Sequence, residues 1–200
     1  MVFVSMLIIT TLTKTMAQNE YNSVKDAKGL AVGDQVTEFT ALDLHDNTFN
    51  LKKALKKGPV VVIFYRGQWC PFCNNHLRNL QDSLQLIYAK GASVIAISPE
   101  KSAFLKQTAE KTGAEFSLLY DEGYKISDLF DVTFRPDYMT RNIYNTMLGA
   151  DLKNAHSDNS EQLPIPATFI IAQDGKIVWR QFDPNYKIRS TVSDIVKNIP

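Results

Sequence analysis

The two cysteines of this chain, Cys70 and Cys73, are separated by two residues and form a Cys-Pro-Phe-Cys motif. At this spacing both sulfurs fall on the first turn of a helix, close enough to form a disulfide without unfolding the chain around them. A thiolate at one position can attack a substrate, and the second cysteine can resolve the product. The motif therefore predicts redox chemistry that alternates between a dithiol and a disulfide.

The segments on either side of the motif are expected to position it. A continuous β-branched and aromatic run from Val60 to Tyr65 predicts a central strand buried on both faces. Pro71 suits the first helical position, and the stretch from Phe72 to Ala89 repeats apolar residues at helical spacing: Leu77, Leu80, Leu84 and Ile87. The free N–H groups and the dipole at a helix start favour an anion, so they draw a thiol there toward its thiolate.

Metal binding and inert packing are the alternatives for this motif. With His76 the cysteines form a C-x2-C-x2-H pattern, but structural zinc needs four ligands, and His45 and His156 lack ligand-like spacing. Haem attachment needs a histidine directly after the second cysteine, where Asn74 stands. Inert thiols would not need a helix start. We therefore expect no metal and no cofactor, and we expect His76 to face solvent.

Strand-like and helix-like segments alternate through the chain, which predicts one α/β domain over residues 29–200 after a polar linker at 18–28. A small hairpin is expected near its N-terminus, and an insertion at 131–163 precedes the last strand pair. Because the insertion departs from the strand-helix rhythm, we expect it to line a substrate groove. The predicted strands span 39–43, 49–51, 60–65, 93–97, 116–120, 167–172 and 177–182, and the predicted helices span 52–57, 72–89, 99–111, 124–130, 138–148 and 186–198.

Composition and charge exclude several classes of function. Hydrophobic residues make up 44% of the chain and charged residues 22%, which is typical of a folded globular protein. A formal net charge of +1 supplies no field that would favour a nucleic acid partner.

The first seventeen residues predict export. An apolar run from Val2 to Leu12 is too short to span a bilayer, and small residues at Thr15 and Ala17 suit a signal-peptidase cut before Gln18. We therefore expect residues 1–17 to be a signal peptide, the mature protein to be periplasmic, and no stable membrane insertion after cleavage. The alternative is a cytoplasmic protein whose translation starts at Met16.

The segment from Val60 to Leu80 resembles the redox-motif region of the thioredoxin-like superfamily. The stretch from Ile95 to Asp121 is similar to its peroxiredoxin branch, the alkyl hydroperoxide reductase and thiol-specific antioxidant family. Leu163 to Gly175 and Asp183 to Arg189 are similar to the subgroup of that branch that carries a WCPxC motif. The resemblance covers about residues 30–200 and implies a thioredoxin-like fold, in which helices flank a central mixed sheet.

The register of this resemblance gives the candidate site residues. The peroxiredoxin motif P-x-x-x-T-x-x-C matches its attacking cysteine to Cys73, its threonine to Cys70 and its proline to Arg66. The arginine that the family carries on a later strand is replaced by Pro166, and Ile165-Pro166 is our candidate for a cis peptide bond. Arg66 is the preferred replacement for that arginine, with Arg180 and Arg189 as alternatives.

Two activities follow from this resemblance. As an antioxidant thiol peroxidase, the protein would reduce hydroperoxides through a sulfenic acid on Cys73, and a thioredoxin-type reductant would reopen the resulting Cys70–Cys73 disulfide. As the alternative, a periplasmic thiol-disulfide oxidoreductase, it would attack protein disulfides with Cys70. A binding module is disfavoured because both cysteines are retained in usable spacing.

Overall fold

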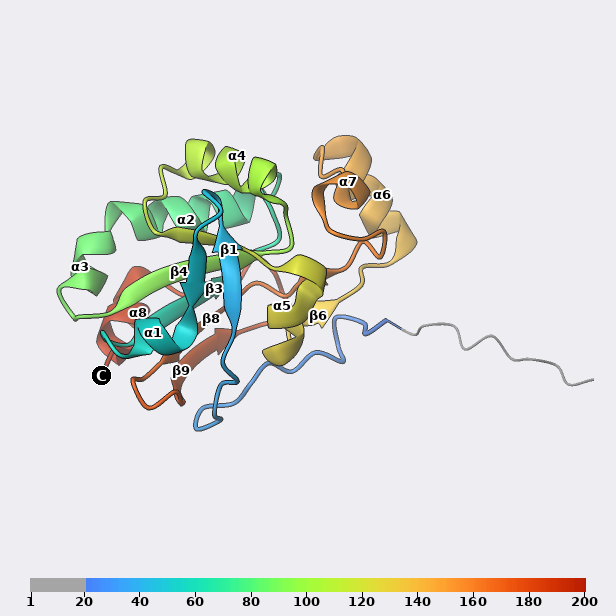
Figure 1. Cartoon of the computed structure of the whole chain (residues 1–200). Helices are drawn as coiled ribbons and strands as arrows, with labels where there is room; N and C mark the ends of the chain where they lie inside the picture. The colour runs from blue at the N-terminus through green and yellow to red at the C-terminus, as the bar shows by residue number, and fades with distance from the viewer. Residues whose placement is uncertain (1–20) are drawn as a thin grey trace, which may run out of the picture.

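The computed structural model describes residues 21–200, which form a seven-stranded sheet in the order β2-β1-β5-β4-β3-β8-β9 (Figure 1). At its centre β3 (Val60–Phe64) pairs in parallel with β4 (Ser93–Ser98) and antiparallel with β8 (Ala167–Ile171). The sheet is therefore mixed, as predicted. Its other strands are β1 (Thr40–Asp43), β2 (Thr48–Asn50), β5 (Ser117–Tyr120) and β9 (Ile177–Phe182), and a separate pair joins β6 (Thr133–Phe134) to β7 (Leu163–Pro164).

Helices cover both faces of this sheet. All five residues of β3 are buried, because successive side chains point to opposite faces and each face carries a hydrophobic core. Val61 and Ile63 pack with residues of α2, α3, α4 and α8, and Val60 and Val62 pack with residues of α1 and α5. The helices are α1 (Leu51–Leu55), α2 (Pro71–Asp82), α3 (Leu84–Tyr88), α4 (Ser102–Thr112), the 3-10 turn η1 (Glu122–Tyr124), α5 (Lys125–Leu129), α6 (Tyr138–Met147), α7 (Leu152–Ala155) and α8 (Val192–Asn198).

Three predicted helices differ from the observed ones. The helix expected over 72–89 is broken at Ser83, whose backbone is not helical, so it becomes α2 and α3. The helix expected from Pro99 starts at Ser102, because the Glu100 side chain turns inward to accept a hydrogen bond from the Gln68 N–H. The helix expected over 186–198 is confined to α8, and residues 183–191 form an irregular segment before it.

The insertion folds as α6, α7 and the strand pair β6–β7, and Figure 1 shows its helices beyond the end of the main sheet. The predicted helix at 138–148 is confirmed as α6. The predicted signal peptide at residues 1–17 lies outside the described residues. Within residues 21–200 no helix is both long and apolar enough to cross a bilayer.

Candidate functional site

The CxxC motif lies where the central strand β3 passes into the helix α2. Cys70 is the residue that caps this helix, and its sulfur accepts a hydrogen bond from the backbone N–H of Cys73 at 3.2 Å. Pro71 occupies the first helical position, where its missing N–H costs nothing. The helix start therefore directs a backbone N–H at the sulfur of Cys70, as the sequence predicted, and in the reduced protein this contact would stabilise a thiolate there.

The two cysteines are joined by a disulfide, with their Cα atoms 5.2 Å apart. Cys70 is 0% exposed and Cys73 is 1% exposed, so the oxidised pair is covered on its outer side. Phe72, which lies between them, remains 43% exposed and stands edge-on to the ring of Tyr186 at a centroid distance of 5.5 Å.

The structure places Arg66 against the sulfur of Cys70. Its Nη2 donates to Cys70 Sγ at 3.2 Å, and its Nη1 donates to the hydroxyl of Tyr144 at 2.9 Å. The side chain is buried, which lowers the pKa of the guanidinium, and none of the ion pairs among residues 21–200 involves it. A positive charge without a carboxylate partner thus lies beside one sulfur.

Arg189 brings a second guanidinium to the other sulfur. Its Nη2 lies 3.8 Å from Cys73 Sγ, and it comes from the irregular segment 183–191. Burial, and then the charge of Arg66, lowers the pKa of Arg189 to about 10. Arg180 was the other candidate to replace the family's arginine. It instead donates to the backbone carbonyls of residues 28–30 and so holds this N-terminal segment against β9. Each sulfur therefore has one arginine of its own.

Aromatic rings surround the Arg66 guanidinium. Its Cζ lies 4.1 Å from the ring centroid of Tyr186, 5.0 Å from that of Trp69 and 5.1 Å from that of Tyr144. Trp69 and Tyr144 also stack, with centroids 4.8 Å apart. Ring faces attract a cation, so they stabilise a buried guanidinium that lacks an acidic partner. Sequence reasoning missed both tyrosines, because Tyr144 lies 78 residues beyond Arg66 and no local pattern links them.

A cleft of about 410 Å³ opens onto Arg66. The insertion at 131–163 supplies one wall of this cleft, and Pro166 forms part of another; that a substrate binds in the cleft stays a prediction. Its lining residues are Ser23, Val24, Arg66, Phe134, Arg135, Pro136, Asp137, Thr140, Tyr144, Ile165, Pro166, Pro184 and Tyr186.

The prediction of a cis bond before Pro166 was wrong. No peptide bond in residues 21–200 is cis. The Ile165 N–H donates to the carbonyl of Val132 at 2.7 Å, and the chain runs on from β7 into β8 without a tight turn. A cis proline serves tight turns, so this continuous path does not require one. Pro166 lies in the cleft wall, and its catalytic role stays a prediction.

His76 does not face solvent, contrary to our expectation. It lies one turn after Cys73 on the inner side of α2, and its Nε2 is 3.2 Å from Ser190 Oγ. Burial, and then the neighbouring charge of Arg189, lowers the pKa of His76 to about 4. The imidazole is therefore neutral near pH 7.

A buried carboxyl group supports the loop that leads to the motif. Glu100 Oε2 accepts from the Gln68 N–H at 2.8 Å, while Oε1 has no hydrogen-bond partner. A Cβ on Gly67 would clash with this Oε1, so only glycine lets the loop pass so close. Burial raises the pKa of Glu100 to about 8, against the lowering effects of the Gln68 N–H and the Lys111 charge.

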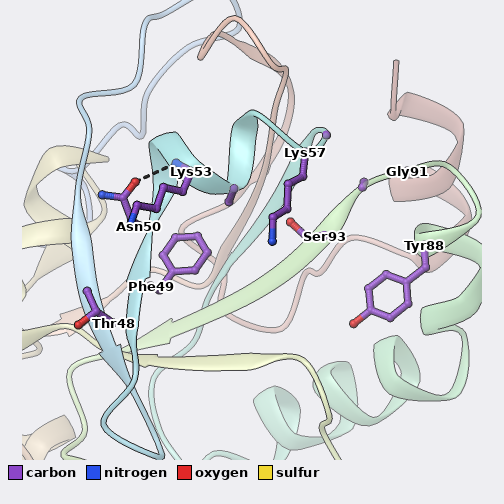
Figure 2. Close-up of a pocket in the computed structure, with 11 residues that line it drawn as sticks. Thr48, Phe49, Asn50, Lys53, Lys57, Tyr88, Gly91 and Ser93 are labelled. Carbon is purple, nitrogen blue, oxygen red and sulfur yellow. Dashed lines mark hydrogen bonds between the residues drawn. The ribbon is translucent and has the colours of Figure 1, made fainter.

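A cavity of about 640 Å³ lies away from the sulfurs (Figure 2). Its lining includes Gly58, just before β3, and Ser93, the first residue of β4, whereas Cys70 follows the other end of β3. Figure 2 shows Phe49, Lys57 and Ser93 around it, without a cysteine or an arginine. We therefore place the candidate active site at the disulfide.

Among residues 21–200 no cluster of three or more His, Cys, Asp or Glu side chains could hold a metal ion.

Comparison with known proteins points to one family. The model described as "AhpC/TSA family" matches residues 32–180. The chain is 30% identical over 112 residues to "Putative peroxiredoxin bcp" of Haemophilus influenzae, covering 56% of this chain and 72% of that protein. It is 34% identical over 115 residues to "Peroxiredoxin Q, chloroplastic" of Oryza sativa subsp. japonica, covering 58% of this chain and 51% of that one. The chain thus spans about half of the rice protein.

A solved structure agrees on the fold. The crystal structure of "Peroxidoxin BcpB from Mycobacterium tuberculosis" matches with a TM-score of 0.62 at 22% identity. The match covers 76% of this chain and 86% of that one. At this identity the likeness supports the thioredoxin-like fold. It does not bear on the reaction, which has to be argued from the residues of the site.

Proposed function

The chain belongs to the AhpC/TSA family and is an oxidoreductase of the thiol peroxidase type, and we propose that Cys73 attacks the hydroperoxide and Cys70 resolves the product. The assignment of Cys73 rests on the register of the family motif, in which it takes the place of the attacking cysteine. The Cys70–Cys73 disulfide of the structure is the bond that such a cycle would form, and it supports the proposal.

The proposed cycle has three steps. The Cys73 thiolate attacks one oxygen of the hydroperoxide, the O–O bond breaks, and the other oxygen leaves as an alcohol or water after taking up a proton. Cys73 is then a sulfenic acid. The Cys70 thiolate attacks its sulfur, the S–S bond forms, and the hydroxyl group leaves as water after protonation. An external dithiol of the thioredoxin type supplies two electrons and two protons and restores both thiols.

The observation that carries this proposal is the pairing of each sulfur with its own guanidinium, Arg66 at Cys70 and Arg189 at Cys73. A helix start by itself makes a weak peroxidase, because a lower thiol pKa also lowers the intrinsic nucleophilicity of the thiolate. Fixed donors aimed at the negative charge that develops on the departing oxygen supply further rate, about tenfold for each 1.4 kcal/mol. The two arginines offer such donors beside the sulfurs.

The cleft beside Arg66 is the proposed entry for the hydroperoxide. It reaches the Arg66 guanidinium between Tyr144 and Tyr186, and much of its lining is apolar or aromatic. The lining includes neither cysteine, and the cleft meets the site at Arg66, whose guanidinium contacts the sulfur of Cys70.

We also propose that the protein is exported and acts in the periplasm. The proposal rests on the composition of residues 1–17, in particular the short apolar run followed by small residues before Gln18. Its test is N-terminal sequencing of the protein recovered from a periplasmic fraction. A chain that starts at Gln18 is expected, and a cytoplasmic chain that starts at Met16 would contradict export.

The test of the activity compares the full chain with Cys70→Ser and Cys73→Ser. The reduced proteins are mixed with hydrogen peroxide in a stopped-flow instrument to measure the rate of oxidation. The masses of the products are determined by mass spectrometry. We expect fast oxidation in the wild type, arrest of Cys70→Ser with one added oxygen, and no fast phase in Cys73→Ser. A rate no better than that of a free thiol, together with fast exchange with a disulfide substrate that needs Cys70, would establish a thiol-disulfide oxidoreductase instead.

A further inference from the structure

A buried hydroxyl group joins the helix of the CxxC motif to the central sheet. Ser190 Oγ lies 3.2 Å from Nε2 of His76 on α2 and 2.8 Å from Oγ1 of Thr168 on β8. All three side chains are buried. Since one hydroxyl has one donor and two acceptor positions, Ser190 can bond both neighbours at once.

Ser190 belongs to the irregular segment 183–191, which carries Arg189 to the site. Among the side-chain hydrogen bonds that the structure describes for this segment, only those of Ser190 join two buried side chains. The Arg189 guanidinium itself contacts Cys73 Sγ at 3.8 Å and the carbonyl of the preceding Ile188 at 3.1 Å. Neither contact fixes the position of the Arg189 backbone relative to α2.

We propose that Ser190 is a positioning residue that holds the guanidinium of Arg189 against the sulfur of Cys73. The proposal rests on the proposed function in one respect, the importance of the thiolate at Cys73. His76 and Cys73 lie one turn apart on the same helix, so a bond from Ser190 to His76 sets the distance between the segment and the sulfur. The bond from Ser190 to Thr168 fixes the same segment to the sheet.

The position of the Arg189 guanidinium affects the pKa of the Cys73 thiol, as the charged and titratable groups around this cysteine show. Arg189 faces the sulfur from the segment 183–191, Arg66 faces the neighbouring Cys70 from the loop after β3, and His76 lies on α2. The His76 imidazole is neutral near pH 7, whereas Arg189 is a cation in direct contact with this sulfur. A positive charge within about 4–6 Å of an acidic group typically lowers the pKa of that group by one to three units.

The experiment measures the thiol pKa of Cys73 from thiolate absorbance at 240 nm, in the Cys70→Ser background and without peroxide. We expect Arg189→Met to raise this pKa by about one unit or more, and Ser190→Ala to raise it by about one unit. Ser190→Thr, which keeps the hydroxyl, should leave it near the parent value. The matched control is Thr112→Val, which removes a buried hydroxyl bond of 2.7 Å to Thr108 on α4 and should not shift it.

A double-mutant cycle separates positioning from general loosening of the fold. If Ser190 acts through Arg189, the Ser190→Ala substitution has no further effect on the Cys73 pKa once Arg189→Met is present. A shift that persists in that background, or no shift in Ser190→Ala alone, would overturn the proposal. Thr168→Val supplies the same test if Ser190→Ala fails to fold. Because no peroxide is used, failure of the proposed peroxidase activity leaves this readout intact.

Discussion

The Nη2 atom of Arg66 lies 3.2 Å from the sulfur of Cys70, and no carboxylate among residues 21–200 forms an ion pair with this guanidinium. Aromatic rings take the place of an acid around it. A carboxylate would neutralise the charge, whereas the rings leave it available to a thiolate. The charge therefore stabilises the reduced pair more than the disulfide, which carries no charge.

The first prediction concerns the reduction potential. Arg66→Met should make the disulfide harder to reduce, because it removes a charge that stabilises the reduced form. Each tenfold change in the equilibrium constant corresponds to about 30 mV, so we expect a potential at least about 30 mV more negative. Equilibration with glutathione buffers measures it. Arg78→Met, at an exposed position on α2, is the control. An unchanged potential in Arg66→Met would contradict this role.

The second prediction concerns stability against pH. The folded protein holds the Glu100 proton up to a pKa of about 8, while the unfolded chain releases it near 4.5. Between these values folding takes up a proton, so this group makes the protein less stable as pH rises, by roughly 1 kcal/mol per unit. Glu100→Gln should remove that slope. Denaturant midpoints of the oxidised proteins at pH 5 and pH 8 test it.

The matched control for this measurement is Glu110→Gln, on the exposed side of α4. It should keep the wild-type dependence on pH. Between pH 5 and pH 8 the denaturant midpoint of wild type should fall relative to that of Glu100→Gln, so the difference between the two midpoints should change in favour of the variant. A constant gap would mean that Glu100 does not hold a proton in this range.

Local sequence was sufficient to predict the motif and the elements on either side of it. Strand, loop and helix follow one another directly from Val60 to Asp82, and so Cys70, Cys73 and Arg66 meet through short-range geometry. The other half of the site could not be predicted in this way. Arg189 reaches Cys73 across 116 residues of chain, and only the packing of the irregular segment 183–191 brings it there.

Burial was the second property that the sequence left open. Glu100 follows a serine and a proline, a pattern typical of a helix start, yet the side chain turns inward to the Gln68 N–H. His76 follows polar residues on α2 but faces the interior, because the segment 183–191 covers that side of the helix. In both cases a partner distant in sequence supplies the hydrogen bond that makes burial of a polar group tolerable.

The third prediction uses Trp69 as a reporter. Trp69 is buried next to Cys70 and stacks on Tyr144, so a disulfide at Cys70 should quench its fluorescence. Reduction should raise the emission, and Trp69→Phe should abolish the change while Trp179, the other tryptophan, keeps a constant background. Emission spectra before and after a dithiol reductant check this. A change that survives in Trp69→Phe would assign the signal to Trp179.

The last prediction concerns Tyr144, which joins the insertion to the site. Tyr144→Phe keeps the ring against Trp69 but loses the hydrogen bond from Arg66 Nη1, whereas Tyr144→Ala loses both. A hydrogen bond to a charged group contributes about 1.5–3 kcal/mol. If about half of that orients the guanidinium, Tyr144→Phe should slow peroxide reduction roughly three- to tenfold, and Tyr144→Ala should slow it further.

Single-turnover rates with hydrogen peroxide measure this effect, and Tyr138→Phe, at an exposed position on the same helix, is the control. The comparison tests whether the insertion takes part in the reaction or only lines the cleft. A wild-type rate in Tyr144→Phe together with a slow Tyr144→Ala would mean that ring packing alone orients Arg66. Wild-type rates in both variants would remove α6 from the catalytic site and leave it as a wall of the substrate cleft.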